Sequence, residues 1–584
     1  MQYKTDIFDR SVNKMMKKIK TIVATMLAAV SALTMSACGG GGGNTSAKED
    51  PTKTYLDVGV FDAGLGTTYF DELKKDFEAY YAETSFEEGK KGVVVRALKK
   101  STEFNPANLI GSMQNYEPVM YILDHGDYED FTKKNMFLDV TDVMTEKYLD
   151  EEGNIAKDTG KAATKSVEDT MYEGYSDLYK KNGHYYAVPY MLSTTGIIYD
   201  ADLFDEAKLF FRKDGTIGAT AADIKAGTAS VGPDGEAGTS DDGLPATWGE
   251  FLKLVEMIRT KNYIPFTWAE SPTTYQLSRL FNAFWANYEG YDDYMLNYTF
   301  NGEDSQFGTI DENNFIELLG QEGRKAAVKA FYDITKNPGN YSTQAVPGGG
   351  NTHKGALMEY VQSKRHGKRI AMTVENSYWE QETREVFESE PSQTTNGYGK
   401  RNFKLMPIPK FVGVDGIEDQ TNTERILPAQ FAESYICLSA KNKNKNADLQ
   451  VGIAKLFIKF MQQKSQLVKY TKNTGCIRPY HYTVTPEEKA TCTPFTQSLL
   501  TFIDEGARLA PNLLSATKRR AYNAEIGFHE TDNGFAFRAK VGNSTYMDPF
   551  TYFYENKSKT VNNAIDDMTT TISGFLKEAG AIAN

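Results

Sequence analysis

The feature of this sequence that most constrains its fold is a regular alternation of short apolar segments with amphipathic ones. YLDVGVFD (residues 55–62) has the pattern of a strand, and the segment after it places Phe70, Leu73, Phe77 and Tyr80 on one face of a helix. GVVVRALK and PVMYILD predict two more strands, and DYEDFTKKN predicts a short helix. Strands that alternate with helices build sheets covered by helices, so we expect an α/β fold with parallel strands.

The same alternation continues along the chain. In LPATWGEFLKLVEMIRT, Thr247 with Glu250 three residues later forms a capping box that predicts the start of a helix. Apolar residues follow at helical spacing at Phe251, Leu254, Val255 and Ile258. GRKAAVKAFYDITK and DLQVGIAKLFIKFMQQ predict further amphipathic helices, whereas RIAMTV, FKLMPIP and SYICLS predict short strands.

Size and charge limit the number of domains and the kinds of partner. The chain has 40% hydrophobic and 24% charged residues, which is typical of a globular protein. Roughly 530 residues follow the N-terminal region, too many for one hydrophobic core, so we expect at least two domains. The net charge of −13 argues against a nucleic-acid partner, because a surface that binds phosphates needs an excess of basic residues.

The N-terminal region has the layout of a signal peptide. A basic cluster at residues 17–20 precedes the apolar run IVATMLAAVSALTM, which is shorter than the roughly 20 residues that a helix needs to cross a bilayer. Residues 1–14 do not fit this layout, so the natural start is Met15 or Met16 in our interpretation. We expect residues 1–37 to be the signal peptide and find no later segment suited to span a membrane.

One cysteine lies directly between the apolar run and five glycines. Met35-Ser36-Ala37-Cys38 resembles the lipobox of bacterial lipoproteins, in which the cysteine becomes the lipid-modified first residue of the mature protein. Acyl chains such as palmitate on Cys38 would provide stable anchoring without a spanning helix. Residues 38–52 then form a flexible tether. The alternative is an ordinary secretory signal with an incidental cysteine.

The other cysteines do not form a disulfide framework. Cys437 lies in an apolar strand pattern, and Cys476 and Cys492 complete an odd number of thiols. We expect free thiols, with a Cys476–Cys492 bridge as the alternative.

Six segments occur in an order that resembles a known family. They are PVMYILDHGDYEDFTKKNMFLDVT, KNGHYYAVPYMLSTTGIIYDADLFDE, LPATWGEFLKLVEMIR, GKRIAMTVENSYWEQ, FKLMPIP and DLQVGIAKLFIKFMQQKSQLVKYTKNTGCIRPY. Together with the lipobox they resemble the extracellular solute-binding proteins of sugar ABC transporters, of the maltose-binding type. The resemblance covers about residues 55–482. It implies two α/β lobes, each a mostly parallel sheet flanked by helices, that are joined by hinge strands and close on a ligand.

The resemblance also implies that each lobe is discontinuous in sequence. We expect residues 53–192 and about 425–466 in the first lobe, and residues 193–424 and 467–584 in the second. The chain would cross between the lobes after YAVPYMLSTTG, between FKLMPIPK and SYICLS, and near QQKSQLVKY.

Candidate ligand-binding residues follow the predicted strands, where open α/β sheets bind ligands. A sugar site needs carboxylates and amides for the hydroxyl groups and aromatic plates for the apolar ring faces. After the first strand, Gly64 and Gly66 would allow the backbone to approach a ligand. A phosphate loop is the alternative for these glycines, but the Gly-Lys-Ser/Thr ending of such a loop is absent from the sequence. This part of the chain contributes Asp62, Gly64, Gly66, Asp124, His125 and Asp127 as candidates. His125 has a capping role as its alternative.

The hinge and the second lobe supply the other candidates. The family resemblance implies a hinge contribution from Tyr190, Ser193 and Thr194, although the family often has a carboxylate where Ser193 stands. Trp268 ends a predicted strand, and Trp379 matches a stacking tryptophan of the family, whereas Trp248 and Trp285 lie on helices and are expected in the core. The candidates here are Tyr190, Ser193, Thr194, Trp268, Glu375, Asn376, Tyr378, Trp379 and Arg478.

The segment GPDGEAGTSDDGLP departs from the family pattern. It concentrates oxygen-bearing side chains on a glycine-rich turn, which is one way to bind calcium. The candidate ligands are Asp234, Glu236, Thr239, Asp241 and Asp242. The alternative is a solvated acidic turn, and no other cofactor is expected.

These features predict a monomeric, lipid-anchored receptor on the extracellular face of a bacterial cell membrane. The resemblance implies that it captures a carbohydrate by hinge closure and delivers it to a membrane permease with a cytoplasmic ATPase. We expect this carbohydrate to be an oligosaccharide. No bond is made or broken. The alternatives are a surface glycan-binding lipoprotein without a transporter and a lipid-anchored glycoside hydrolase. The sequence has no Gly-x-Ser-x-Gly elbow, HExxH helix or phosphate loop.

Overall fold

A computed structural model covers the 584-residue chain. It describes residues 49–578 except 61–63, 67, 100–110, 112, 115–117, 124–127, 173–174, 271–274, 300–301, 303–306, 311–312, 431–433, 442–445 and 512–535. Cys38 therefore lies outside the described residues. Thr54–Asn584 form one compact unit. No helix in the described part of the chain combines the length and the apolar character needed to cross a membrane.

The first sheet has five strands in the order β2-β1-β3-β14-β6. Its strands are β1 (Thr54–Val60), β2 (Val93–Lys99), β3 (Met120–Leu123), β6 (Val188–Pro189) and β14 (Tyr435–Leu438). β1 pairs in parallel with β2 and β3, whereas β14 runs antiparallel to β3 and β6. We call this sheet and the elements packed on it the first lobe.

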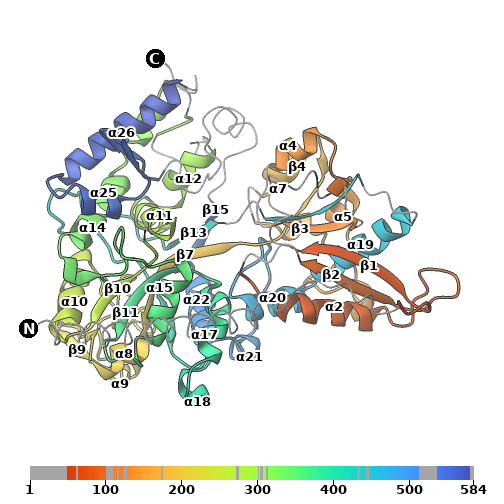
Figure 1. Cartoon of the computed structure of the whole chain (residues 1–584), viewed down its shortest axis with the longest axis horizontal. Helices are drawn as coiled ribbons and strands as arrows, with labels where there is room; N and C mark the ends of the chain where they lie inside the picture. Colours follow the sequence, from red (N-terminus) through yellow and green to blue (C-terminus); the bar gives the residue numbers. More distant parts are fainter. Residues whose placement is uncertain are drawn as a thin grey trace, which may run out of the picture. The chain divides into compact units, whose positions relative to one another are not determined.

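The helices of the first lobe pack through aromatic side chains. The main ones are α2 (Thr68–Tyr80), α19 (Ala447–Met461) and α20 (Lys464–Thr474). Phe70, Leu73 and Phe77 form the buried face of α2, as the sequence predicts. Phe77 meets Phe457 of α19 with ring centroids 4.7 Å apart. Burial of each such side chain contributes about 1.5–3 kcal/mol, so this face holds α2 on the sheet (Figure 1).

Shorter elements complete the first lobe. They are α4 (Tyr128–Lys133), α5 (Thr141–Thr145), α6 (Ala156–Thr159), η1 (Glu168–Thr170), α7 (Tyr175–Tyr179), and the hairpin of β4 (Lys180–Lys181) and β5 (His184–Tyr185).

The second sheet has the order β10-β11-β7-β13-β15, and β12 also pairs with β7. Its strands are β7 (Ser193–Asp200), β10 (Ile264–Thr267), β11 (Ile370–Asn376), β12 (Phe403–Met406), β13 (Ile426–Gln430) and β15 (Arg508–Pro511). The pairs β10–β11 and β13–β15 are parallel, whereas β7 is antiparallel to β11, β12 and β13. This sheet and its elements form the second lobe.

The expectation of mostly parallel sheets is wrong in this detail, although the α/β class is confirmed. Both sheets are mixed because β6, β7, β13 and β14 belong to segments that cross from one sheet to the other. In each sheet one of these strands runs against its neighbours: β14 in the first sheet and β7 in the second.

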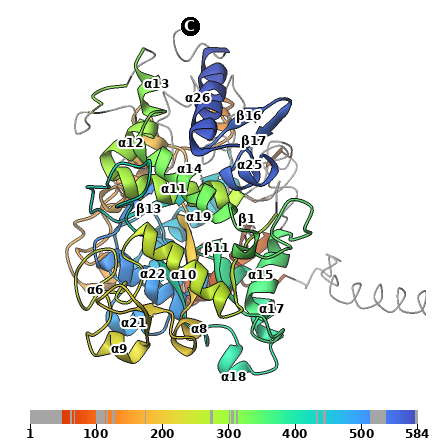
Figure 2. The same ribbon diagram turned by 90° about the vertical axis from the view of Figure 1, so that its left-hand side faces the viewer.

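The helices of the second lobe enclose the larger hydrophobic core, which contains the predicted core residues Trp248 and Trp285. The longer helices are α10 (Trp248–Thr260), α11 (Tyr275–Glu289), α14 (Glu322–Thr335), α15 (His353–Gln362), α22 (Pro494–Asp504) and α26 (Val561–Glu578). Figure 2 shows α26 beside α25 (Pro549–Glu555) and the hairpin of β16 (Ala539–Val541) and β17 (Ser544–Tyr546), where the C-terminal segment completes this lobe.

The remaining elements of the second lobe are short. They are α8 (Ala201–Glu206), β8 (Phe210–Phe211), β9 (Ile217–Ala219), α9 (Ala221–Lys225), α12 (Tyr291–Thr299), α13 (Phe315–Leu318), η2 (Pro338–Asn340), α16 (Trp379–Glu382), α17 (Arg384–Glu388), α18 (Gln393–Asn396) and α21 (Pro486–Lys489).

The start of α10 confirms the predicted cap with one change. The Thr247 side chain accepts a hydrogen bond from the Glu250 backbone N–H, as in a capping box. The Glu250 carboxylate, however, accepts from the backbone N–H of Ala246 at 2.8 Å rather than from that of Thr247. Two backbone donors at the helix start are still satisfied, so the stabilising effect is retained.

The sheet order gives the places where the chain passes between the two sheets. The first falls between β6 and β7, and the second between β13 and β14. Leu467 and Tyr470 of α20 belong to the hydrophobic core of the first lobe. The ring centroids of Tyr470 and of Tyr69 in α2 are 4.7 Å apart. The return to the second sheet therefore comes between α20 and β15, because the apolar face of α20 is buried against α2.

Cys437, Cys476 and Cys492 are buried free thiols. The expectation of free thiols in this part of the chain is confirmed.

Candidate functional site

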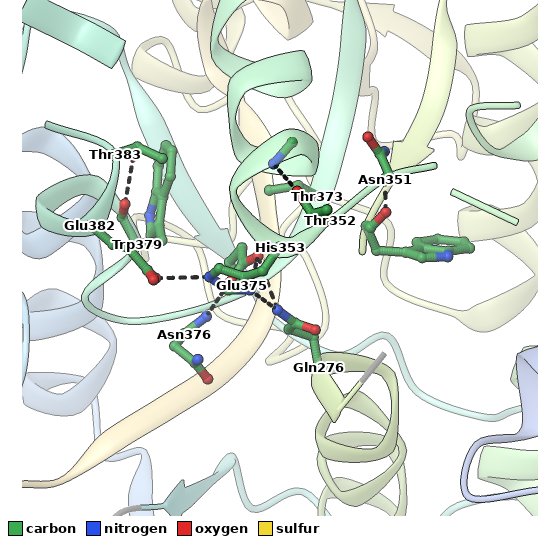
Figure 3. A network of polar contacts seen from close by, with 12 residues as sticks. Gln276, Asn351, Thr352, His353, Thr373, Glu375, Asn376, Trp379, Glu382 and Thr383 are labelled. Carbon is green, nitrogen blue, oxygen red and sulfur yellow. Dashed lines mark hydrogen bonds and ion pairs between the residues drawn. The ribbon is translucent and has the colours of Figure 1, made fainter. Parts of the chain in front are cut away.

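Buried polar side chains gather where β11 ends in the second lobe. Glu375 and Asn376 are the last residues of β11, His353 begins α15, and Gln276 lies in the first turn of α11 (Figure 3). Thr352 caps α15 by accepting a hydrogen bond from the Gly355 backbone N–H, which fixes the position of His353. The carboxyl end of a strand and two helix starts therefore meet at one place.

His353 lies between two carboxylates. Its Nε2 is 2.8 Å from Glu382 Oε2, and its Nδ1 is 3.8 Å from Glu375 Oε1. The side-chain amide of Gln276 contacts both His353 Nδ1 and Glu375 Oε1. Glu375 is almost fully buried, so these contacts replace the water that a carboxylate needs.

The charges of this cluster depend on one another. Burial by itself lowers the pKa of His353, but the carboxylates of Glu375 and Glu382 outweigh it and raise this pKa to about 9. Burial raises the pKa of Glu375 to about 7, although His353 acts in the opposite direction. At neutral pH the imidazole is protonated and lies between the two carboxyl groups.

Asn376 connects this cluster to the hinge. Its Oδ1 accepts hydrogen bonds from Arg279 Nη1 at 3.1 Å and from Thr195 Oγ1 of β7 at 2.5 Å. Its Nδ2 donates to the Tyr378 hydroxyl at 3.1 Å. The predicted residues Glu375, Asn376 and Tyr378 are thus brought together.

The glycine loop of the first lobe meets the turn after β11. Gly64 and Gly66 have φ angles of +81° and +70°, in the left-handed region. A Cβ atom on Gly64 would lie 3.3 Å from Tyr378, and one on Gly66 would lie 2.3 Å from the amide nitrogen of Gln381. Only glycine permits both the backbone conformation and this approach. We call residues 64–66 together with 375–382 the inter-lobe contact.

The hinge residues Ser193 and Thr194 lie beside this contact. Ser193 Oγ is 3.0 Å from Ser377 Oγ, and Ser377 Oγ is 3.6 Å from Cys476 Sγ. The backbone carbonyl of Thr194 accepts a hydrogen bond from the Ser377 N–H at 2.9 Å. Both hinge residues are buried, so the structure places them among structural hydrogen bonds.

Tyr190 and Arg478 contact each other in the first lobe. The guanidinium carbon of Arg478 lies 4.6 Å from the centre of the Tyr190 ring. Arg478 is 0% exposed, and Tyr190 is 6% exposed. The sequence predicted both as site residues from different segments, and the structure brings them together.

Trp268 and Trp379 do not offer a ring face to solvent. Trp268 is 2% exposed, packs against Phe550 and donates a hydrogen bond from its indole N–H to the Ala345 carbonyl. Trp379 is 0% exposed and packs among Phe387, Phe403 and other rings. Their interpretation as stacking plates is corrected here, because both are core residues with neighbours on their faces.

The calcium prediction finds no support. Within the described ranges no group of three or more His, Cys, Asp or Glu side chains is arranged to hold a metal ion. The loop oxygens instead accept hydrogen bonds within the turn: Asp241 from Thr239 Oγ1 and the Asp234 N–H, and Asp242 from the Gly238 N–H. Asp234 also pairs with Arg425 at 3.4 Å, and Glu236 is exposed. These hydrogen bonds close the loop, and the calcium site stays a prediction.

Four predicted residues, Asp62, Asp124, His125 and Asp127, fall outside the described residues. They stay predictions.

Sequence reasoning missed Gln276, Arg279, His353 and Glu382. A signal was present for the first two, because polar residues three apart interrupt the apolar helix pattern YQLSRLFNAFW. For His353 the Thr-His-Lys-Gly cap sequence indicated a helix start but not its partners. These contacts join residues far apart in the chain, which no local pattern reveals.

The fold and the sequence both match known proteins. Two solved structures with similar folds are RafE in complex with raffinose, at 15% identity, and the apo form of RafE from Streptococcus pneumoniae, at 14% identity. The alignments cover 89% and 90% of this chain and 99% of each RafE chain, with a TM-score of 0.50 in both cases. At these identities the likeness shows the fold alone. A comparison with curated protein sequences gives no significant match.

The family is shown by sequence. The family model described as bacterial extracellular solute-binding protein matches residues 82–491. The resemblance found in the sequence is confirmed, as is the expectation of a binding protein rather than an enzyme. Since the match spans well over half of the 584 residues, the chain belongs to the bacterial extracellular solute-binding proteins.

Proposed function

We propose that this protein is a lipid-anchored receptor that captures a carbohydrate between its two lobes and delivers it to an ABC-transporter permease. The observation that most supports the proposal is the inter-lobe contact. It joins the loop after β1 of one sheet to the turn after β11 of the other, at the strand ends where α/β sheets bind ligands.

The polar groups at this place suit a ligand with many hydroxyl groups. Glu375, Asn376 and Gln276 supply acceptors and donors, and Tyr378 adds an aromatic ring with a hydroxyl. A sugar offers the same mixture of donors, acceptors and apolar faces. The raffinose in the RafE complex is the kind of ligand that we propose for this chain.

Capture works by differential binding. A ligand shifts the balance between an open and a closed form only by its difference in affinity for the two. If groups of both lobes touch the ligand only in the closed form, binding energy becomes a change of shape that the permease recognises. The glycines at 64 and 66 allow the first lobe to come close enough for this.

The binding step is tested by thermal denaturation of the purified mature protein with raffinose, maltose and other mono- and oligosaccharides. A ligand at 100 times its Kd stabilises the folded protein by about 2.7 kcal/mol, which raises the Tm measurably. The sugar should be recovered unchanged. If the whole panel leaves the Tm where it was, the carbohydrate proposal is wrong.

Lipid anchoring is tested by Cys38→Ala in cells. The wild-type protein should sediment with membranes and carry acyl chains by mass spectrometry. The variant should be released to the medium or stay unprocessed. Membrane attachment of the variant equal to that of the wild type would contradict the proposal.

Delivery is tested by uptake of a bound, radiolabelled sugar in cells with and without this protein. Loss of uptake supports the transport role. Unchanged uptake, together with lost surface binding, would favour a glycan-binding lipoprotein without a transporter.

A further inference from the structure

Arg478 carries a buried positive charge that pairs with no carboxylate in the described part of the chain. Its side chain is 0% exposed, and within the described part of the chain its Nε, Nη1 and Nη2 have no hydrogen-bond partner. Its guanidinium carbon lies 4.6 Å from the centre of the Tyr190 ring, 4.9 Å from that of Tyr470 and 5.9 Å from that of Tyr69. We call these three tyrosines and Arg478 the tyrosine cage.

Aromatic rings replace only part of what this charge loses on burial. A guanidinium over ring faces gains a modest attraction, whereas its N–H groups still lack the acceptors that water would provide. Buried charges in native proteins are normally paired, and an unpaired one calls for an explanation such as a bound ion or ligand.

The cage combines a positive charge with hydrogen-bond donors. Tyr69 Oη and Tyr470 Oη are also buried without a hydrogen-bond partner among the described residues. Arginine donates hydrogen bonds and cannot accept them, and each tyrosine hydroxyl has a proton to give. The group that complements such a set accepts several hydrogen bonds and carries a negative charge. A carboxylate does both, and a guanidinium binds it with two parallel bonds.

The cage borders the inter-lobe contact. Tyr69 is in the first turn of α2, three residues after Gly66. Cys476, two residues before Arg478, contacts Ser377, which directly follows β11. The bridge between Leu192 and Ile477 ties the same segment to the start of the hinge strand. A ligand held at the inter-lobe contact is therefore next to the cage.

We propose that the tyrosine cage receives a carboxylate of the bound carbohydrate, so that the preferred ligand class is acidic saccharides that contain uronic acid. This inference rests on the proposed function, since it names the ligand class of the same site.

The experiment compares acidic disaccharides with their neutral methyl esters by isothermal titration calorimetry. Digalacturonate, a glucuronate disaccharide and a mannuronate disaccharide are each paired with the ester of the same skeleton. We expect at least one acid to bind tenfold or more tightly than its ester. In Arg478→Met this ratio should fall to about one. Tyr69→Phe and Tyr470→Phe, which remove only a hydroxyl, should lower it severalfold.

Tyr480→Phe is the matched control. Tyr480 is also buried in the first lobe, but its hydroxyl donates a hydrogen bond to the Pro189 carbonyl at 2.7 Å. This variant should lose stability and keep the acid-to-ester ratio. If Arg478→Met does not fold, the two tyrosine variants still decide the question.

The outcomes separate this inference from the proposed function. Neutral saccharides that bind as tightly as every acid, with no effect of the cage variants, overturn the inference and leave the function standing. Acetate or inorganic phosphate that binds alone as tightly as the acidic sugars overturns the assignment to a carbohydrate carboxylate. No binding of any saccharide overturns both.

Discussion

Two arginines are buried to the same degree in this protein, and their surroundings differ. Arg401 in the second lobe is 1% exposed, and its Nη2 and Nη1 donate hydrogen bonds to Asp200 at 2.6 Å and to the Val361 carbonyl at 2.7 Å. Asp200 also accepts from Arg369 at 2.7 Å. Arg478 in the first lobe is 0% exposed and has rings around it but no hydrogen-bond acceptor in the described part of the chain.

The difference between Arg401 and Arg478 lies in their hydrogen-bond partners and not in their burial. The Asp200 cluster joins α8, β7 and the segment before β12, so its charges are compensated within the fold. In the tyrosine cage, no described residue accepts a hydrogen bond from the guanidinium group. Charges that a fold satisfies by itself serve stability, whereas an unsatisfied one at a strand-end site indicates recognition.

The largest effect is expected from a substitution that removes the counter-charge in the Asp200 cluster. Asp200→Asn leaves two buried guanidinium groups without their counter-charge but keeps the shape of the side chain. We expect a loss of about 3–5 kcal/mol in the free energy of unfolding, measured with urea. Although burial opposes it, Arg401 and Arg369 hold the pKa of Asp200 below its usual value, so this stability is present above pH 4 and is lost as the pH falls further. A loss below 1 kcal/mol would contradict this account.

The next largest effect is expected at His353, whose positive charge is also compensated within the fold. The pKa of about 9 in the folded protein lies above the unfolded value near 6.5. The contribution to stability is therefore complete below pH 6.5 and disappears as the pH rises through 9. His353→Gln should cost on the order of 2 kcal/mol at pH 6 and much less at pH 10, measured by thermal unfolding. An equal cost at both pH values would show that the carboxylates do not hold a protonated imidazole.

A smaller effect of opposite sign is expected at Arg478. Replacing an uncompensated buried charge with an apolar side chain of similar length is often neutral or stabilising. Arg478→Met without ligand should leave the free energy of unfolding unchanged or raise it by about 1 kcal/mol. A loss of several kcal/mol would mean that Arg478 is as structural as Arg401, and the comparison would fail.

The smallest effects are expected from removing single tyrosine hydroxyl groups, one with a hydrogen-bond partner and one without among the described residues. Tyr480→Phe removes a paired hydroxyl and leaves the Pro189 carbonyl without its donor, so we expect a cost of about 1 kcal/mol. Tyr470→Phe removes a hydroxyl that has no hydrogen-bond partner among the described residues, and it should cost close to nothing. Urea unfolding of the two variants side by side gives the difference, and equal costs would contradict the assignment of the cage as unsatisfied.

Much of the fold is predictable because it follows from periodicity. The helices α2, α10, α14 and α19 and the strands β1, β2 and β11 lie where apolar spacing places them. The third crossing was misplaced because the apolar face of α20 shows that the helix is packed but not on which sheet. The expectation of mostly parallel sheets was wrong because the direction of a strand depends on where the chain crosses between the lobes, and the crossings join distant segments.

The candidate site is less predictable for a physical reason. Gly64 and Tyr378 were predicted because turn residues and polar groups follow strands, and Tyr190 because its segment resembles the hinge strand of the family. Their binding roles, like that of Arg478, stay predictions. Trp379 was misassigned because an aromatic residue after a strand has the same local pattern whether it packs or binds. The partners of His353 come from α11, β11 and α16, and only tertiary structure brings them together.

The most direct test of the central claim is calorimetric titration of a binding saccharide into the wild-type protein and into one variant of each lobe. Tyr190→Ala alters the first lobe and Tyr378→Ala the second, and circular dichroism checks that both fold. We predict one saccharide per chain and at least a tenfold loss of affinity in each variant, because both lobes hold the ligand. Wild-type affinity in either folded variant would contradict capture between the lobes.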